Sequence, residues 1–83
     1  MKGKHRKTLA AIFAKPTRAN IRFSDIESLI RALGGEVREG EGSRVVLELF
    51  GSREYAHRPP GKEAKRYMVE KIRDWLKELE VTP

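Results

Sequence analysis

The sequence predicts an α+β fold in the order (α)αβββα, in which three short antiparallel strands carry the helices on one face of the sheet. Residues 24–33 repeat apolar side chains at helical spacing, and so do residues 62–80. Between these segments, apolar and polar side chains alternate over residues 45–50, and a Gly-Ser pair separates this run from a second one, which is typical of a hairpin. The helix in parentheses is expected over residues 4–14.

Length and composition indicate one small domain of 83 residues. The chain has no cysteine, which excludes disulfides and thiolate metal sites and fits a reducing compartment. No secretory signal is visible, and the longest apolar run, residues 9–14, is far shorter than a membrane span. We therefore expect a cytoplasmic protein without a membrane partner.

The net charge of +6 is concentrated near the N-terminus. Residues 1–23 contain seven Lys or Arg and no acidic residue, whereas residues 24–83 contain eleven Lys or Arg against twelve Asp or Glu. A basic segment on a nearly neutral domain favours nucleic acid or an acidic protein as partner, and a solubilising tail is the alternative. The expected division is a basic extension over residues 1–22 and the main domain over residues 23–83.

The helix expected over residues 4–14 carries a small apolar stripe of Leu9, Ile12 and Phe13. Pro16 ends this helix, because the residue before a proline is pushed out of helical geometry. The simplest use of the stripe is to pack back onto the domain.

The helix expected over residues 24–33 has clearer boundaries. Ser24 is the expected N-cap, and Glu27, three residues later, would complete a capping box. Two glycines at 34 and 35 end the helix, and a short strand over residues 36–39 follows with Val37 pointing inward. The buried stripe of the helix comprises Ile26, Leu29, Ile30 and Leu33.

The hairpin depends on its turn. If Gly51 and Ser52 form a two-residue turn, Phe50 faces Arg53, Glu48 faces Tyr55 and Val46 faces His57. Arg44 and Glu48 are then the two diagonal neighbours of His57 on the solvent face of the sheet. The opposite, mostly apolar face comprises Val45, Leu47, Leu49, Glu54 and Ala56.

The final helix is expected over residues 62–80. Lys62, Lys65 and Arg66 would crowd its first turns, which is the unfavourable end of the helix dipole for cations. This placement suggests a nearby anion such as a phosphate, and a solvated helix face is the alternative. The apolar face of the helix comprises Ala64, Met68, Ile72, Trp75, Leu76 and Leu79.

Several motifs, in this order and spacing, resemble the HicA toxins of bacterial toxin–antitoxin modules. The resemblance covers about residues 24–80. Its motifs are Asp25-Ile26-Glu27-x-Leu29, Leu33-Gly34, Gly42-Ser43, Phe50-Gly51, Arg58-Pro59-Pro60-Gly61-Lys62-Glu63 and Ile72-x-x-x-Leu76. The segment Thr8-Leu9-x-x-Ile12-Phe13-Ala14-x-Pro16 resembles the N-terminal extension of one subgroup.

The resemblance implies a fold like that of double-stranded RNA-binding domains, whose element order matches the one expected here. It also implies an mRNA endonuclease that arrests growth, and a HicB-type antitoxin that binds the toxin as a hetero-oligomer and blocks its site. One position departs from the family: Arg44 stands where the family's usual catalytic histidine would be, and Val45 follows it.

Metal-independent RNA cleavage uses the 2′-OH of the RNA as nucleophile and needs an acid, a base and a cation for the phosphorane. We assign the acid/base role to His57, the phosphate contact to Arg44, and to Glu48 the role of orienting His57 or acting as base. Tyr55 and Phe50 are suited to stack on unpaired bases. Neither a metal nor another cofactor is expected.

The remaining RNA contacts are assigned to basic residues, together with Tyr55: Arg53, Arg58, Lys62, Lys65, Arg66, Lys4, Arg6 and Lys7. Two alternatives stay open. The chain could bind RNA without cleaving it, or it could be an inactive toxin-like domain that acts through its antitoxin. For His57, the alternative to a catalytic role is an exposed strand histidine that pairs with Glu48, and composition alone favours this alternative.

Overall fold

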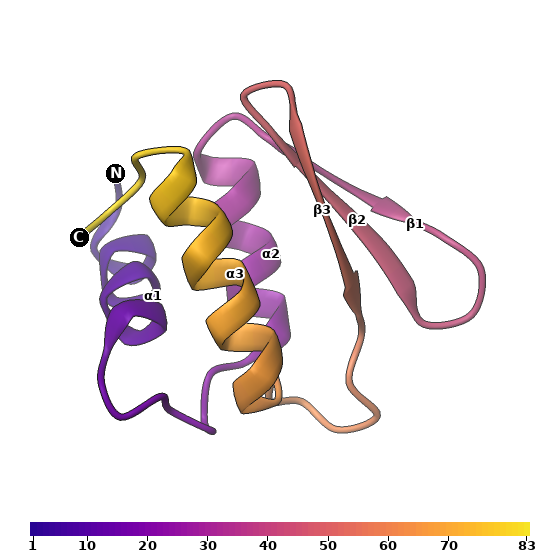
Figure 1. Ribbon diagram of the computed structural model, residues 1–83, viewed down its shortest axis with the longest axis horizontal. Coiled ribbons are helices and arrows are strands. Elements are labelled where there is room, and N and C mark those ends of the chain that lie inside the picture. The colour runs from indigo at the N-terminus through magenta and orange to yellow at the C-terminus, as the bar shows by residue number, and fades with distance from the viewer.

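The computed structural model describes all 83 residues and has the expected order of elements. The helices and strands are α1 (Gly3–Phe13), α2 (Phe23–Ala32), β1 (Glu36–Glu39), β2 (Arg44–Leu49), β3 (Ser52–His57) and α3 (Arg66–Glu78). The strands form one antiparallel sheet in the order β1-β2-β3, and the three helices lie on one side of it (Figure 1). The predicted α+β fold is confirmed. None of the helices is long and apolar enough to cross a bilayer.

The core lies between the sheet and the helices. β2 buries alternate residues, and Ala56 of β3 joins them, so the predicted inner face of the hairpin is correct for these positions. Removal of this apolar surface from water is the main stabilising contribution of the fold. The buried apolar residues are Leu9, Ile12, Ile21, Phe23, Ile26, Leu29, Ile30, Val45, Leu47, Leu49, Ala56, Ala64, Met68, Val69, Ile72, Trp75 and Leu76.

The predicted turn of the hairpin is wrong by one residue. Phe50 and Gly51 form the turn, with φ values of 51° and 79°, and both positive values are what a type I′ hairpin turn requires. Ser52 therefore belongs to β3, where its hydroxyl accepts a 2.9 Å hydrogen bond from the buried indole N–H of Trp75. A buried indole N–H needs such an acceptor, which gives a physical reason for this turn.

The shift changes the partners across the hairpin but not the faces. Each residue of β2 now pairs two positions earlier on β3 than predicted, and a displacement of two keeps every side chain on its original face. The observed pairs are Arg44↔His57, Val45↔Ala56, Val46↔Tyr55, Leu47↔Glu54, Glu48↔Arg53 and Leu49↔Ser52.

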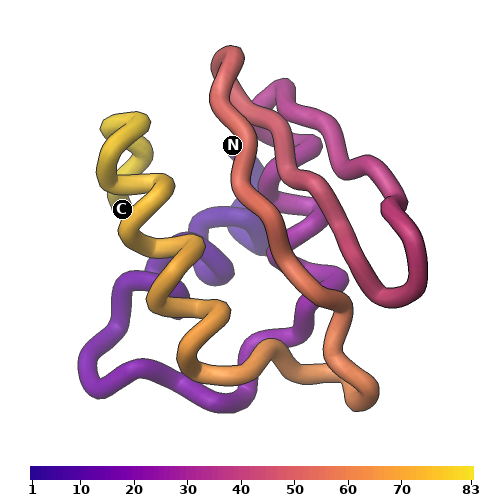
Figure 2. Tube along the Cα trace, turned by 45° about the vertical axis from the view of Figure 1, so that its right-hand side comes forward, coloured from indigo at the N-terminus to yellow at the C-terminus, as the bar shows by residue number.

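The predicted cap at Ser24 is also wrong. α2 begins at Phe23, its N-cap is Arg22, and no side chain caps it. The N–H of Phe23 donates instead to the carbonyl of Lys62 at 3.0 Å, so the first orphan donor is satisfied by backbone. The segment before α2 runs beside the loop before α3, where Arg22 pairs with Glu63 in a bridge (Figure 2).

Because of the same bridge, α3 begins later in the sequence than predicted. Residues 62–64 pair with residues 21–23 and therefore lie outside the helix, and the N–H of Ala64 donates to the carbonyl of Ile21 at 2.8 Å. α3 therefore starts at Arg66 rather than at Lys62, and it ends at Glu78. The predicted crowding of cations in the first helical turn is wrong for Lys62 and Lys65, which precede the helix.

The predicted packing of the first helix is confirmed. Leu9 and Ile12 of α1 are buried in the shared core. Arg73 of α3 is itself buried and holds the C-terminal end of α1, since its guanidinium donates to the carbonyls of Ile12 at 2.8 Å and Ala14 at 3.1 Å. Cations are stabilised at this end of a helix, where carbonyls lack intrahelical partners.

Candidate functional site

His57 and Arg44 are direct cross-strand partners. His57 is the last residue of β3, Arg44 is the first residue of β2, and both side chains are exposed. Side chains opposite one another in an antiparallel pair have Cβ atoms about 4.5–5.5 Å apart. The two residues alternate with the buried Val45 and Ala56, so they face away from the helices. The site prediction placed them on a diagonal, and the observed register makes them direct neighbours.

A cavity of about 680 Å³ adjoins this pair. Besides Arg44 and His57, its walls include Tyr55, Glu41 and Lys71. Lys71 extends from α3 to β3, where its ammonium donates to the carbonyl of Tyr55 at 2.7 Å and lies 3.6 Å from the Glu54 carboxylate. The other lining residues are Gly40, Val45, Val46 and Ala56.

Sequence reasoning missed Glu41 and Lys71. Glu41 lies in the turn between β1 and β2, and its carboxylate has no ion-pair partner. Lys71 precedes a buried residue of α3, and nothing in its spacing indicated that it reaches the strand. Only the contact between α3 and β3 brings it to the cavity.

Glu48 does not meet His57, so the predicted contact between them is wrong. Glu48 pairs with Arg53 across the strands. On that face of the sheet, the Val46–Tyr55 pair separates them from His57. The two oxygens of its carboxylate bind Nε of Arg53 at 2.7 Å and Nε of Arg38 at 2.6 Å. The hydrogen bond from Arg53, with the charge of Arg38, lowers the pKa of Glu48 below its ordinary value.

Arg53, predicted to contact RNA, is held by that carboxylate. It stays largely exposed on the outer face of the sheet, and the hydrogen bond to Glu48 raises its pKa. The trio of Arg38, Glu48 and Arg53 therefore forms a surface ion-pair cluster at the hairpin end opposite His57.

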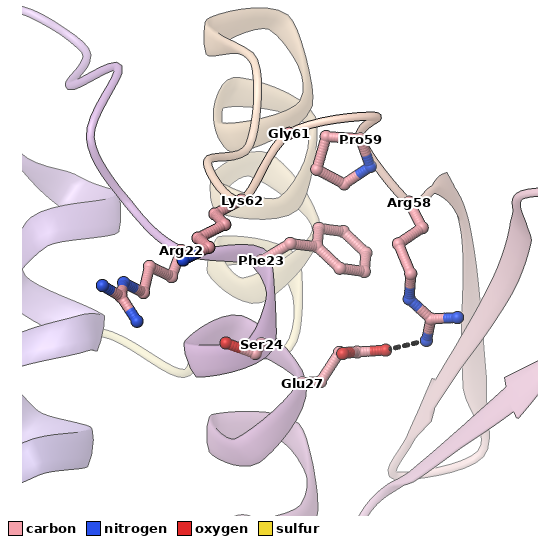
Figure 3. Close-up of a pocket in the computed structure, with 8 residues that line it drawn as sticks. All are labelled: Arg22, Phe23, Ser24, Glu27, Arg58, Pro59, Gly61 and Lys62. Atoms are coloured by element: carbon pink, nitrogen blue, oxygen red, sulfur yellow. Dashed lines mark hydrogen bonds and ion pairs between the residues drawn. The ribbon is translucent and has the colours of Figure 1, made fainter.

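Arg58 directly follows His57 and connects three elements. Its guanidinium binds both oxygens of Glu39 at the end of β1, at 2.6 and 2.7 Å, and also binds Glu27 of α2 (Figure 3). The Glu27 side chain is only 10% exposed, so the arginine neutralises a buried carboxylate. Hydrogen bonds from Arg58 lower the pKa of Glu39, and Glu39 and Glu27 together raise that of Arg58. The Arg58 guanidinium, which had been assigned to RNA, is therefore bound by carboxylates within the fold.

The other basic residues assigned to RNA lie in several places. Lys62 lines a cleft of about 310 Å³ at the start of α2, where it and Arg22 lie on one side of Phe23 (Figure 3). Lys65 lines a cleft of about 150 Å³ that also includes His57. Arg66 is partly engaged, since its Nε donates to the carbonyl of Thr17 at 3.2 Å.

On α1, Lys4 and Lys7 line a further cleft, and Lys4 lies 3.7 Å from the carboxylate of Asp25. Arg6 is exposed on the same helix but lines none of these clefts. On α1, Lys4 and Lys7 therefore line a cleft and Arg6 does not.

The two aromatic residues expected to stack on bases are not neighbours. Tyr55 is 60% exposed and lies two residues before His57 on the same face of β3. Phe50 is 65% exposed and lies at the turn, at the opposite end of the hairpin. A third exposed aromatic residue, Tyr67, lines the smaller cleft beside His57 and was not singled out from the sequence.

Comparison of this chain with protein-family models, with curated proteins and with solved structures finds no match.

Proposed function

We propose that this chain binds mRNA at the His57–Arg44 end of the sheet and cleaves it, as the toxin of a toxin–antitoxin pair. One observation carries the proposal: an imidazole and a guanidinium with no carboxylate partner are cross-strand neighbours on an open face. Imidazole is the side chain best suited to proton transfer near neutral pH, and guanidinium binds phosphate bidentately. The resemblance to HicA toxins supports the biological setting.

The reaction needs no group beyond the RNA and the side chains of the cavity. Glu41 accepts the proton of the 2′-OH as O2′ attacks phosphorus, and Arg44 stabilises the charge on the phosphorane oxygens. The P–O5′ bond then breaks, and the His57 imidazolium donates a proton to the leaving oxygen. The products are a 2′,3′-cyclic phosphate and a 5′-OH, and Glu41 takes the role that had been assigned to Glu48.

Purified protein incubated with mRNA in the presence of EDTA tests this proposal. We expect fragments that end in 2′,3′-cyclic phosphate, and no cleavage of a strand with 2′-deoxyribose at the cut position. His57→Ala and Arg44→Ala should each reduce the rate by about 100-fold or more. Arg31→Ala, which removes an exposed cation from α2, is the matched control and should cleave normally. Cleavage that persists in both the His57 and the Arg44 variants would refute the assignment.

Binding without cleavage is the second candidate, and a specific observation favours it. The carboxylate of Glu48, expected beside His57, is bound by two arginines elsewhere. The only carboxylate that lines the cavity is that of Glu41, on an exposed turn. RNA that is bound with its length unchanged after prolonged incubation would support this candidate over the nuclease.

The proposed partner is a HicB-type antitoxin that forms a hetero-oligomer with this chain. Co-expression with a small protein encoded beside this gene tests the partnership. We expect that expression of the chain alone arrests growth, that the neighbour relieves the arrest, and that the two proteins co-purify. Growth that is unaffected by the chain would contradict the toxin assignment.

A further inference from the structure

Five clefts on this molecule form a connected series. Two of them on α1 share Lys7, Thr8 and Asp25, and the second shares Arg22 with the cleft at the start of α2. That cleft shares Arg58 and Pro59 with the small cleft beside α3, which in turn shares His57 with the cavity over Arg44. We call this series the basic track; it runs from α1, past the start of α2 and the loop after β3, to His57.

The basic track contains the whole charge excess of the protein. Nine basic and three acidic residues line it, a net charge of +6, which equals that of the entire chain. The basic residues are Lys4, Lys7, Arg18, Arg22, Arg44, Arg58, Lys62, Lys65 and Lys71, and the acidic ones are Asp25, Glu27 and Glu41. The rest of the chain is therefore formally neutral, and the positive potential of the molecule concentrates along these clefts.

Two of the three carboxylates on the track are already paired. Asp25 lies 3.7 Å from Lys4, and Glu27 is bound by Arg58. Lys7, Arg18, Arg22, Lys62 and Lys65 have no ion-pair partner. These five cations extend along the track between α1 and His57, where they are available to an anionic ligand with repeated charges.

Aromatic side chains occur on the track at its His57 end. His57 lines both the cavity that includes Tyr55 and the cleft that includes Tyr67, and these tyrosines are 60% and 58% exposed. Exposed aromatic rings beside a line of cations are the features by which proteins bind unpaired nucleotides, since bases stack on the rings while cations contact the phosphates. A protein partner would instead call for an apolar anchor site. On the part of the track along α1 and the start of α2, apolar residues are few: none lines the first cleft on α1, two line the second, and one lines the cleft at the start of α2.

We infer that one unpaired strand of RNA lies along the basic track, with bases at Tyr55 and Tyr67 and its backbone extending past Lys62 and Arg22 to Lys7 on α1. The inference rests on the RNA binding of the proposed function but not on cleavage. It gives the N-terminal extension a specific role, because α1 supplies the distal phosphate contacts and Arg73 holds it in place.

Strand length and salt dependence test the inference. The ligand is a labelled 2′-O-methyl RNA, which cannot be cut through its 2′ oxygen, and affinity is measured by fluorescence anisotropy between about 0.05 and 0.3 M salt. A strand of about twelve nucleotides should bind more tightly, and with a steeper salt dependence, than one of about four, because only the longer strand reaches α1.

The decisive variant is the triple substitution Lys7→Ala, Arg18→Ala and Arg22→Ala. Its matched control is Lys15→Ala, Arg31→Ala and Lys77→Ala, which removes the same charge from exposed positions off the track. The track variant should bind the long strand about tenfold more weakly or worse, with a salt slope shallower by about 2, given about 0.7 per lost phosphate contact. The control should keep the slope of the wild type, and both should melt as the wild type does.

Three results would overturn the inference: equal losses in the two triple variants, no effect of strand length, or tighter binding of an RNA duplex or of polyglutamate than of the single strand. These results are distinct from failure of the proposed function. If the protein binds and no RNA is ever cut, the nuclease proposal fails and the track stands. If RNA is cut and the two triple variants behave alike, only the track fails.

Discussion

Arg44 and His57 face each other across the first pair of the β2–β3 ladder, on the face of the sheet opposite to that of the buried Val45 and Ala56. This pairing exists because Phe50 and Gly51, rather than Gly51 and Ser52, make the turn. The same turn separates His57 from Glu48, which lies four residues along β2 from Arg44. One turn therefore decides which side chains share the site.

Glu41→Gln is expected to slow RNA cleavage by about 100-fold, because the substitution removes the carboxylate in the cavity while keeping its shape. Glu48→Gln is the matched control and should leave the rate near that of the wild type. The pH–rate profile separates a chemical role from a structural one, since loss of the base removes the acidic limb of a bell-shaped profile. A larger loss of rate in Glu48→Gln than in Glu41→Gln would instead support Glu48 as the base or as the residue that orients His57.

Arg58→Met is expected to destabilise the fold by about 2 kcal/mol, because it leaves Glu27 buried without its partner. The loss falls below the roughly 3–5 kcal/mol of a fully buried pair, since the Arg58 side chain is 40% exposed. Urea unfolding measures it. The double change of Arg58→Met with Glu27→Gln should recover part of the loss, and no recovery would show that the charge of Glu27 is not the cause.

Phe50→Asn is expected to stabilise the protein by about 1 kcal/mol. Phe50 holds a φ of 51°, which costs a bulky side chain roughly 1–2 kcal/mol, and Asn-Gly is the preferred pair for a type I′ turn. Little packing is lost, because the ring is 65% exposed. Thermal unfolding checks the result, and Phe50→Val should shift the midpoint in the opposite direction. A destabilised Asn variant would indicate that the ring packs on the sheet.

Arg73→Met is expected to loosen α1, since the carbonyls of Ile12 and Ala14 would lose their donors. An unsatisfied buried acceptor costs about 1–3 kcal/mol. Hydrogen exchange should accelerate more in α1 than in the sheet. Lys77→Met, on the exposed side of the same helix, is the control and should leave exchange in α1 unchanged. Uniform acceleration throughout the protein would mean that Arg73 supports the whole core instead.

Acid should destabilise the fold through Glu39 and Glu48. The pKa of each is lowered from the ordinary value of 4.5 by its arginine partner, so the folded protein binds fewer protons there than the unfolded chain. This stabilisation is fully present above pH 4.5 and is lost as pH falls through the lower folded values. Urea midpoints at about pH 6 and pH 3 should therefore differ less in Glu48→Gln than in the wild type. An equal difference in both proteins would contradict the linkage.

Local patterns predicted the elements and their faces. The strand over residues 36–39 has its predicted bounds, and the predicted apolar stripes of the helices are buried except for Phe13, Leu33 and Leu79, which are half-buried against the core. Both result from the spacing of apolar side chains along a few turns of helix or a few residues of strand. The starts of α2 and α3 were misplaced because residues 21–23 and 62–64 pair with each other, a contact between distant parts of the chain that no local pattern reveals.

Three features follow from spacing between near neighbours in the sequence: the order of the elements, the apolar face of each one, and the face of the sheet on which His57 and Arg44 lie. Three others depend on the folded chain: the hairpin register, the pairing of Arg58 with Glu27, and the cavity shared by Glu41 and Lys71. Each of these depends on satisfying a buried polar group or bringing together side chains that are far apart in the sequence. Such partners are chosen by packing in three dimensions rather than by local pattern.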